Sequence, residues 1–431
     1  MKKRRRIFIG LAEVGGGASA LCTGFRRLGH VCDFYSLTEH PFKYGGQAHN
    51  LLIRLLQKTH LEWEKSFNLK RHWRRLFWKW VSKVLLAFFL CYCIVKYDDF
   101  IFYFGATFFR GGQDLPVLKF FRKKITFMYC GSDSRPPYLN GKNINLSAPE
   151  KVGELAEMTR QLKSKILWAE KYADHIIDSP PQALFHERRY ISILSIGFAS
   201  EINGAVSEIG TGVSSAHVKI IHSPSHQQSK GTCEIRRMIE RLKKKYSIEY
   251  MEVVNQPNSV VKTLLSECDF VVDQLWSDTP MAGLAAEAAF FGKPAVVGGY
   301  YADFVNGENF PEGHLPPTVY VHPDRVEAAI EKLTADALYR LRLGAEAKRY
   351  VEANYKPEHT AGRVLQVIEG TFPPQWLLDP CDIDYLTGYG MAERDFKRMV
   401  KALVDWGGVQ ALGLADKPEL EHAFMEIVNA A

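Results

Sequence analysis

The chain has 431 residues, more than one ordinary domain holds, so we expect two domains. Hydrophobic residues make up 46% of the chain and charged residues 24%, a composition that excludes an intrinsically disordered protein. The net charge is +7, but residues 1–124 contain 23 Lys and Arg against 8 Asp and Glu, which leaves +15 there and −8 in the remainder. This asymmetry indicates an anionic partner for the first part: nucleic acid, an anionic membrane surface or a phosphorylated substrate.

The cysteines favour a reducing compartment. They lie at positions 22, 32, 91, 93, 130, 233, 268 and 381. None forms a CxxC pair with metal-ligand spacing, so we expect reduced thiols in a cytoplasmic protein, with no metal site and no cofactor.

The first half of the chain alternates predicted strands with predicted helices. The strands are 7–9, 31–35, 100–104, 125–129 and 175–177, and the helices are 18–28, 115–121 and 152–172. The glycine loop Gly15-Gly16-Gly17 joins the first strand to the first helix, an opening typical of a doubly wound sheet. This alternation predicts an α/β domain at 1–195, with a parallel sheet flanked by helices.

The alternation stops and then restarts. Residues 196–215 are rich in Gly, Ser and Ala, and we expect the interdomain linker there. In the second domain, 216–360, the predicted strands are 218–221, 249–254, 270–272 and 295–297, and the helices are 233–246, 259–267, 282–291, 326–335 and 337–355. Residues 361–431 are expected to form a C-terminal helical extension.

The helix that begins at Gly283 is the first candidate for ligand binding. It follows Asp273 and Gln274, which come directly after a predicted strand, and ligands of open α/β sheets bind at strand ends. A helix N-terminus offers free N–H groups to a diphosphate. Glu287 lies one turn into the helix, where its carboxylate can accept hydrogen bonds from ribose hydroxyls. The alternative is a solvated surface carboxylate, which its two alanine neighbours in the chain disfavour.

A second candidate follows the strand that ends at Ile221. It contains Ser223 and then Lys230, Gly231 and Thr232, at the start of a predicted helix. Lys230 supplies a point charge for a sugar-nucleotide diphosphate, and Thr232 can cap the helix or contact phosphate. The alternative is an ordinary capped turn with an exposed lysine.

Together these segments resemble the retaining GT-B glycosyltransferases of glycosyltransferase family 4. The family has a Lys-Gly helix start and a later Glu-Ala-Met-x-x-Gly-x-Pro stretch. Here they read Lys230-Gly231-Thr232 and Glu287-Ala288-Ala289-Phe290-Phe291-Gly292-Lys293-Pro294. The resemblance implies two Rossmann-like domains facing a cleft, Lys230 on the donor diphosphate, Glu287 on the ribose, and transfer with retention of anomeric configuration.

Two stretches of the first domain add to the resemblance. Gly15-Gly16-Gly17-Ala18 is similar to the first-strand loop of the family, which implies that Gly16 and Gly17 lie at the donor. Gly131-Ser132-Asp133-Ser134-Arg135 is similar to a Gly-Ser-Asp-x-Arg stretch of many members. We expect Asp133 as the candidate catalytic residue near the acceptor, and Arg135 at the acceptor. Asp133 can equally be a structural cap of its loop.

The chain also departs from the family pattern. A Glu often stands eight residues before the ribose-binding one, where this chain has Thr279, and a usual basic residue is replaced by Ser225. A strand that often carries His residues reads Phe100-Ile101-Phe102-Tyr103. Two alternatives therefore stay open: a sugar-nucleotide 2-epimerase, and an inactive GT-B subunit that partners an active transferase. No Asp-x-Asp motif suited to a metal-bound diphosphate is present, which favours metal-independent transfer.

Residues 48–95 are predicted as a helical insertion with a basic stripe and an apolar stripe. The basic residues are Arg71, Arg75, Lys79 and Lys83, and the apolar ones are Trp73, Phe77, Trp80 and Val84. Such a helix suits an anionic membrane interface, where it would bring the first domain to a lipid-linked acceptor on the cytoplasmic face. The alternative is a core helix with a solvated basic face. No nucleic-acid motif accompanies it, so we expect no nucleic acid. The apolar run Val84–Val95 has 12 residues against the ~20 of a membrane span, so no transmembrane helix is expected.

Overall fold

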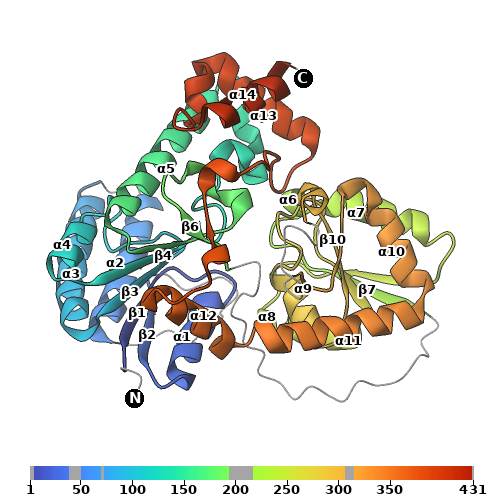
Figure 1. Cartoon of the computed structure of the whole chain (residues 1–431), viewed down its shortest axis with the longest axis horizontal. Helices are drawn as coiled ribbons and strands as arrows, with labels where there is room; N and C mark the ends of the chain where they lie inside the picture. The colour runs from blue at the N-terminus through green and yellow to red at the C-terminus, as the bar shows by residue number, and fades with distance from the viewer. Residues whose placement is uncertain (1–3, 38–49, 69–71, 194–216, 306–314, 430–431) are drawn as a thin grey trace.

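The structure is a computed structural model that describes residues 4–37, 50–68, 72–193, 217–305 and 315–429. Figure 1 shows two lobes side by side, each built on a sheet with helices packed around it. Within the described ranges the sheets have seven and five strands. The expected α/β class with two Rossmann-like domains is therefore confirmed.

The first lobe is a mainly parallel sheet covered on both faces. Its strands are β1 (Arg6–Leu11), β2 (Val31–Ser36), β3 (Asp99–Tyr103), β4 (Lys124–Met128), β5 (His175–Ile177), β6 (Tyr190–Ile191) and β12 (Leu377–Leu378). Its helices are α1 (Gly17–Arg27), α2 (Leu51–Asn68), α3 (His72–Lys96), α4 (Asp114–Phe120) and α5 (Val152–Tyr172). The strand order is β12-β6-β5-β4-β3-β1-β2, and β12 alone of these described strands runs antiparallel, beside β6.

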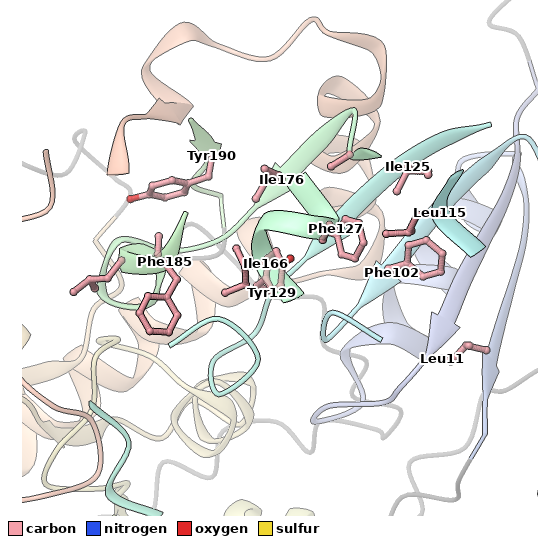
Figure 2. Close-up of a cluster of buried hydrophobic side chains, with 14 of the residues drawn as sticks. Leu11, Phe102, Leu115, Ile125, Phe127, Tyr129, Ile166, Ile176, Phe185 and Tyr190 are labelled. Carbon is pink, nitrogen blue, oxygen red and sulfur yellow. The ribbon is translucent and has the colours of Figure 1, made fainter. Parts of the chain in front are cut away.

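The central strands of this lobe are buried on both faces, so they are continuously apolar, and many of their side chains are aromatic. Phe100, Ile101 and Phe102 of β3 are fully buried, as expected for a continuous apolar run in a covered parallel sheet. Figure 2 shows the side chains of Phe102 and Phe127 lying together in this core; their ring centroids are 5.3 Å apart. Burial of each such ring stabilises the fold by about 1.5–3 kcal/mol.

The second lobe is a fully parallel sheet. Its strands are β7 (Val218–His222), β8 (Ile248–Glu252), β9 (Phe270–Val272), β10 (Ala295–Gly298) and β11 (Val319–Val321), in the order β11-β10-β9-β7-β8. Its helices are α6 (Gln227–Lys230), α7 (Thr232–Leu242), α8 (Asn258–Glu267), α9 (Gly283–Phe290), α10 (Val326–Ala335) and α11 (Ala337–Asn354). The strand order reverses between β7 and β9, and ligands of open α/β sheets bind at such a reversal.

The chain then crosses back to the first lobe. Helix α12 (Pro357–Glu369) packs closely on α1, where a Cβ on Gly24 would lie 2.0 Å from the carbonyl oxygen of Pro357. Strand β12 extends the first sheet, and α13 (Glu393–Gly407) and α14 (Pro418–Asn429) follow. The Tyr138 hydroxyl donates to the Leu412 carbonyl at 3.1 Å. The predicted helical extension is present, and it is packed on the first domain. The predicted linker 196–215 lies outside the described residues.

Helix α3 is longer than its apolar run. It has 25 residues, and its segment Trp73–Lys96 is long and apolar enough to cross a membrane, by length and composition only. The sequence analysis counted only Val84–Val95, but the helix continues through the basic residues before that run, so its length alone does not exclude a membrane span. The expectation of no transmembrane helix stays a prediction. A core helix passes the same test, so packing has to distinguish the two.

Candidate functional site

A buried lysine marks the carboxyl edge of the second sheet. Helix α6 ends at Lys230, and Gly231, at φ 72°, turns the chain directly into α7. A Cβ at Gly231 would lie 2.7 Å from the Leu275 side chain, so both the backbone conformation and the space require glycine. The Lys230 ammonium donates to Gln274 Oε1, and the Tyr389 hydroxyl lies 3.4 Å away.

The surroundings of Lys230 keep it charged. Burial lowers its pKa, but Tyr389, Asp273 and Asp278 together outweigh burial and raise it. A protonated amine at the end of a parallel sheet suits an anionic ligand group. Lys230, Asp273 and Gln274, which the sequence analysis placed at a donor site, are thus brought together by the fold.

Three buried polar atoms around Lys230 have no hydrogen-bond partner in the described part of the chain. They are Asp273 Oδ2, Gln274 Nε2 and Arg135 Nε. An unpaired buried polar group costs about 1–3 kcal/mol, so such a cluster is unusual in a site with only a structural role. Since the cluster contains one acceptor and two donors, it suits a ligand that offers both, such as a sugar with its hydroxyls.

Arg135 joins the two domains. Its guanidinium forms an ion pair with Asp278, and both side chains are 4% exposed. It also stacks on the Tyr389 ring, with 4.3 Å between the guanidinium carbon and the ring centroid. Arg135, expected at an acceptor, therefore lies beside the Lys230 cluster. Sequence reasoning missed Asp278 as its partner, although Asp278 adjoins Thr279, the position where the family often has a carboxylate.

Tyr389 is the second residue that sequence reasoning missed. Its backbone pairs with the first domain, because Gly141 N–H donates to the Tyr389 carbonyl and Tyr389 N–H donates to the Leu139 carbonyl, both at 2.8 Å. The next amide, of Gly390, donates to the Trp276 carbonyl of the second domain at 2.9 Å. This segment of the extension holds the Tyr389 side chain between the domains.

Glu287 lies on α9, away from the Lys230 contacts. Its Oε1 accepts a hydrogen bond from Asn258 Nδ2 at 2.8 Å, at the start of α8. Burial raises the pKa of Glu287, although the Asn258 hydrogen bond and Lys262 oppose that shift. A ligand that contacts both Glu287 and Lys230 must extend from α8 to the Lys230 cluster, as an elongated nucleotide-sugar would.

The start of α9 is open. No side chain caps it, and a Cβ on Gly283 would meet no atom within 4 Å. The small residues after Gly283 allow α9 to pack closely on the sheet, since Ala285, Ala286, Ala288 and Ala289 are all buried. An uncapped N-terminus at the carboxyl edge of a sheet is available to a phosphate.

Ser223 and Thr232 use their hydroxyls internally. The Ser223 hydroxyl donates to the Val253 carbonyl at 3.0 Å. Thr232 Oγ1 lies 2.8 Å from His222 Nε2, and burial lowers the pKa of His222. These contacts position the turn before Lys230, and a donor contact of either hydroxyl stays a prediction.

The glycine loop of the first domain already contains an anion. The Glu13 carboxylate accepts hydrogen bonds from the N–H groups of Val14, Ala18 and Ser19, at 2.9–3.1 Å. Burial raises the pKa of Glu13, and these amides oppose that shift. The donor role of Gly16 and Gly17 stays a prediction. Because Glu13 already accepts hydrogen bonds from amides at the start of α1, fewer of these amides are available to a donor phosphate than the glycine pattern suggests.

Asp133 is a buried carboxyl at the end of β4. Burial raises its pKa to about 7, with Asp178 adding to the shift and the Cys130 N–H opposing it. The Cys130 N–H donates to Asp133 Oδ1 at 3.0 Å, which is the loop-cap role considered above. A pKa of about 7 also suits proton transfer, so both interpretations of Asp133 stay open.

The predicted membrane residues lie elsewhere. Trp73, Arg75, Lys79 and Trp80 belong to α3, on the side of the first lobe away from the second (Figure 1), whereas Arg71 lies outside the described residues. Among the residues that the structure describes, no group of three or more His, Cys, Asp or Glu side chains is placed to hold a metal ion.

Comparisons with known proteins give information on the fold alone. No family model matches the chain, and no curated protein matches it. Among solved structures it is similar to the N-terminal domain of Candida albicans trehalose-6-phosphate phosphatase, with TM-score 0.50 and 12% identity over 86% of this chain and 98% of that one. Anabaena HepE in complex with UDP-glucose matches with TM-score 0.45 and 11% identity over 85% and 100% of the two chains. Apo OtsA matches with TM-score 0.44 and 13% identity over 86% and 100%.

At these identities the likeness concerns the fold alone. Two parallel sheets followed by C-terminal helices form the GT-B arrangement, which confirms the fold class expected from the sequence.

Proposed function

We propose that the chain is a nucleotide-sugar-dependent glycosyltransferase, similar to the retaining members of family 4, that transfers a sugar to a glycan or lipid-linked acceptor. The donor would lie along the carboxyl edge of the second sheet, with its diphosphate at Lys230 and the open start of α9 and its ribose at Glu287. The acceptor would approach from the first domain, near Asp133.

The observation that carries this proposal is the polar cluster around Lys230. It combines a buried ammonium whose pKa is raised with three unpartnered polar atoms, all at the carboxyl edge or the domain junction. A leaving diphosphate needs a fixed positive charge, and a sugar needs donors and acceptors together. A structural ion-pair network would need neither an unpaired amide nor an unpaired carboxylate oxygen.

The test is a thermal-shift screen of the purified full chain against UDP-, GDP-, ADP- and CMP-sugars. A ligand that binds only the native state raises the melting temperature, and the rise grows with the logarithm of the ligand concentration divided by its dissociation constant. We expect one base to stand out. If none of the four classes shifts the transition at millimolar concentration, the donor site is not where we place it.

Glu287→Ala is expected to weaken binding of that nucleotide by about tenfold to a hundredfold. Hydrogen bonds to a charged group contribute about 1.5–3 kcal/mol, and the variant removes those from the ribose hydroxyls. Calorimetric titration of wild type and variant measures the difference. Glu346→Ala, on the exposed side of α11, is the matched control. An unchanged affinity would remove the ribose role from Glu287.

Transfer is expected to proceed without a divalent metal. Lys230 and the helix amides would stabilise the departing diphosphate, the part that a metal plays in other transferases. The measurement is the initial rate of transfer after EDTA treatment and again after addition of Mg²⁺ or Mn²⁺. Loss of activity with EDTA and recovery with metal would contradict this assignment.

The same preparations distinguish the two alternatives. A 2-epimerase would convert the nucleotide-sugar without releasing free nucleoside diphosphate. An inactive binding subunit would bind the donor but neither transfer nor hydrolyse it. The departures at Thr279 and Ser225 are the features that favour this alternative. The location that suits the proposed acceptor is the cytoplasmic side of a membrane.

A further inference from the structure

The outward face of α3 is a continuous apolar surface. Six large side chains on it are at least half exposed: Trp73, Phe77, Trp80, Val84, Phe88 and Val95. At 3.6 residues per turn these side chains fall within an arc of about 80°, and they cover about 33 Å of helix length. Trp73 and Trp80 are 72% and 67% exposed, which is unusual for the largest apolar side chain. This surface is called the α3 face below.

The opposite side of α3 belongs to the core. Phe89, Leu90, Cys93 and Ile94 are buried in the same cluster as Phe8 and Tyr35 of the first sheet. The Phe89 and Tyr35 ring centroids are 5.1 Å apart, and Lys96 forms an ion pair with Asp33 at 2.8 Å. A bilayer-spanning α3 would have to leave this packing and expose the sheet. The length of the helix therefore does not make it a span, and its two sides have different environments.

Cations border the α3 face. Residues 50–96 contain ten Lys and Arg but only two Asp and Glu. By helix geometry Arg74 and Lys83 lie about 80° and 100° from the centre of the apolar arc, one on each side, and Lys79 lies about 140° from it on the same side as Lys83. Arg75 falls about 180° from the arc, so it does not border the apolar side chains as the four-residue spacing suggested.

We propose that the α3 face docks the protein on an anionic bilayer surface, with α3 lying parallel to the membrane plane. Tryptophan and phenylalanine side chains insert at the level of the headgroups, and flanking lysines bind anionic lipid. The bordering cations favour anionic lipid over a second copy of the chain, since two such faces would repel each other. This inference goes beyond the transferase proposal and does not depend on the donor site.

The experiment is co-sedimentation of the full chain with vesicles of phosphatidylcholine, with or without phosphatidylserine, at low and high salt. We expect sedimentation with the anionic vesicles at low salt and release at high salt, because surface charges are screened beyond about 8 Å at physiological ionic strength. Lys79→Glu with Lys83→Glu should weaken binding at least about thirtyfold, from about 1 kcal/mol for each lysine lost. Trp73→Ser with Trp80→Ser should weaken it at least tenfold.

Matched control variants make the same substitutions at sites away from the α3 face, and so test whether the position of the substituted residues determines binding. Lys151→Glu with Lys244→Glu makes the same change of charge at exposed sites elsewhere. Trp406→Ser removes a tryptophan that is 57% exposed on the C-terminal extension. Both controls should sediment like wild type. The proposal is overturned if wild type stays in the supernatant at low salt, if the α3 variants bind like their controls, or if bound protein resists an alkaline carbonate wash as a spanning helix does.

Discussion

Asp278→Asn is expected to lower the free energy of unfolding by about 3–5 kcal/mol, the usual cost of breaking a buried ion pair from one side. The variant leaves the Arg135 guanidinium buried at the junction of the two domains, where its Nε already lacks a partner. Urea unfolding followed by tryptophan fluorescence measures the change, and Trp276 lies at this junction, where its carbonyl accepts a hydrogen bond from the Gly390 N–H at 2.9 Å.

Two further variants show whether the loss comes from the unpaired charge. Replacing both partners, as Arg135→Met with Asp278→Leu, should restore most of the stability, because apolar pairs replace buried ion pairs at little cost. Asp303→Asn breaks the exposed pair with Arg325 and should cost less than about 1 kcal/mol. If Asp278→Asn proves as mild as Asp303→Asn, the two domains do not meet through Arg135 in solution.

The alternation of strands and helices carried most of the fold prediction. Helices α5 and α10 begin and end where the sequence pattern predicted, because their apolar positions recur regularly over three or more turns. Strands β6, β11 and β12 were missed. β6 and β12 have only two residues each, and β11 contains no fully buried residue, unlike the three-residue strands β5 and β9 that the apolar pattern did predict. They are strands only because neighbours pair with them; Leu377 of β12, for example, pairs with Ile191 of β6.

The sequence predicted those residues of the site that follow the carboxyl ends of strands. Lys230, Asp273 and Gln274 follow strands that lie side by side, so the carboxyl-edge rule brings them together. Tyr389 contacts Lys230 from a segment whose path depends on how the extension packs on the first domain, and no local pattern specifies that path. Glu13 presents the opposite difficulty: the glycine loop was read correctly as a loop, but the carboxylate that fills it is visible only in three dimensions.

Lys230→Met is expected to reduce the initial rate of sugar transfer by about a hundredfold to a thousandfold, which is the usual effect of removing one preorganised stabiliser of developing charge. Methionine keeps the length of the side chain and removes only the ammonium. Lys230 is the cation that contacts both Gln274 and Tyr389, and burial makes its charge act more strongly than it would in water.

The comparison that identifies the role is between Lys230→Met, Tyr389→Phe and Lys244→Met. Tyr389→Phe keeps the ring stacked on Arg135 and removes only the hydroxyl beside the ammonium, so we expect a smaller loss of about tenfold or less, from one hydrogen bond. Lys244 is exposed on the second domain, and its variant should match wild type. In the proposed role the ammonium acts on the leaving diphosphate, so the loss in Lys230→Met should fall on kcat more than on KM. A variant that kept more than a tenth of the wild-type rate would show that the diphosphate charge is neutralised elsewhere, and it would move the donor site away from Lys230.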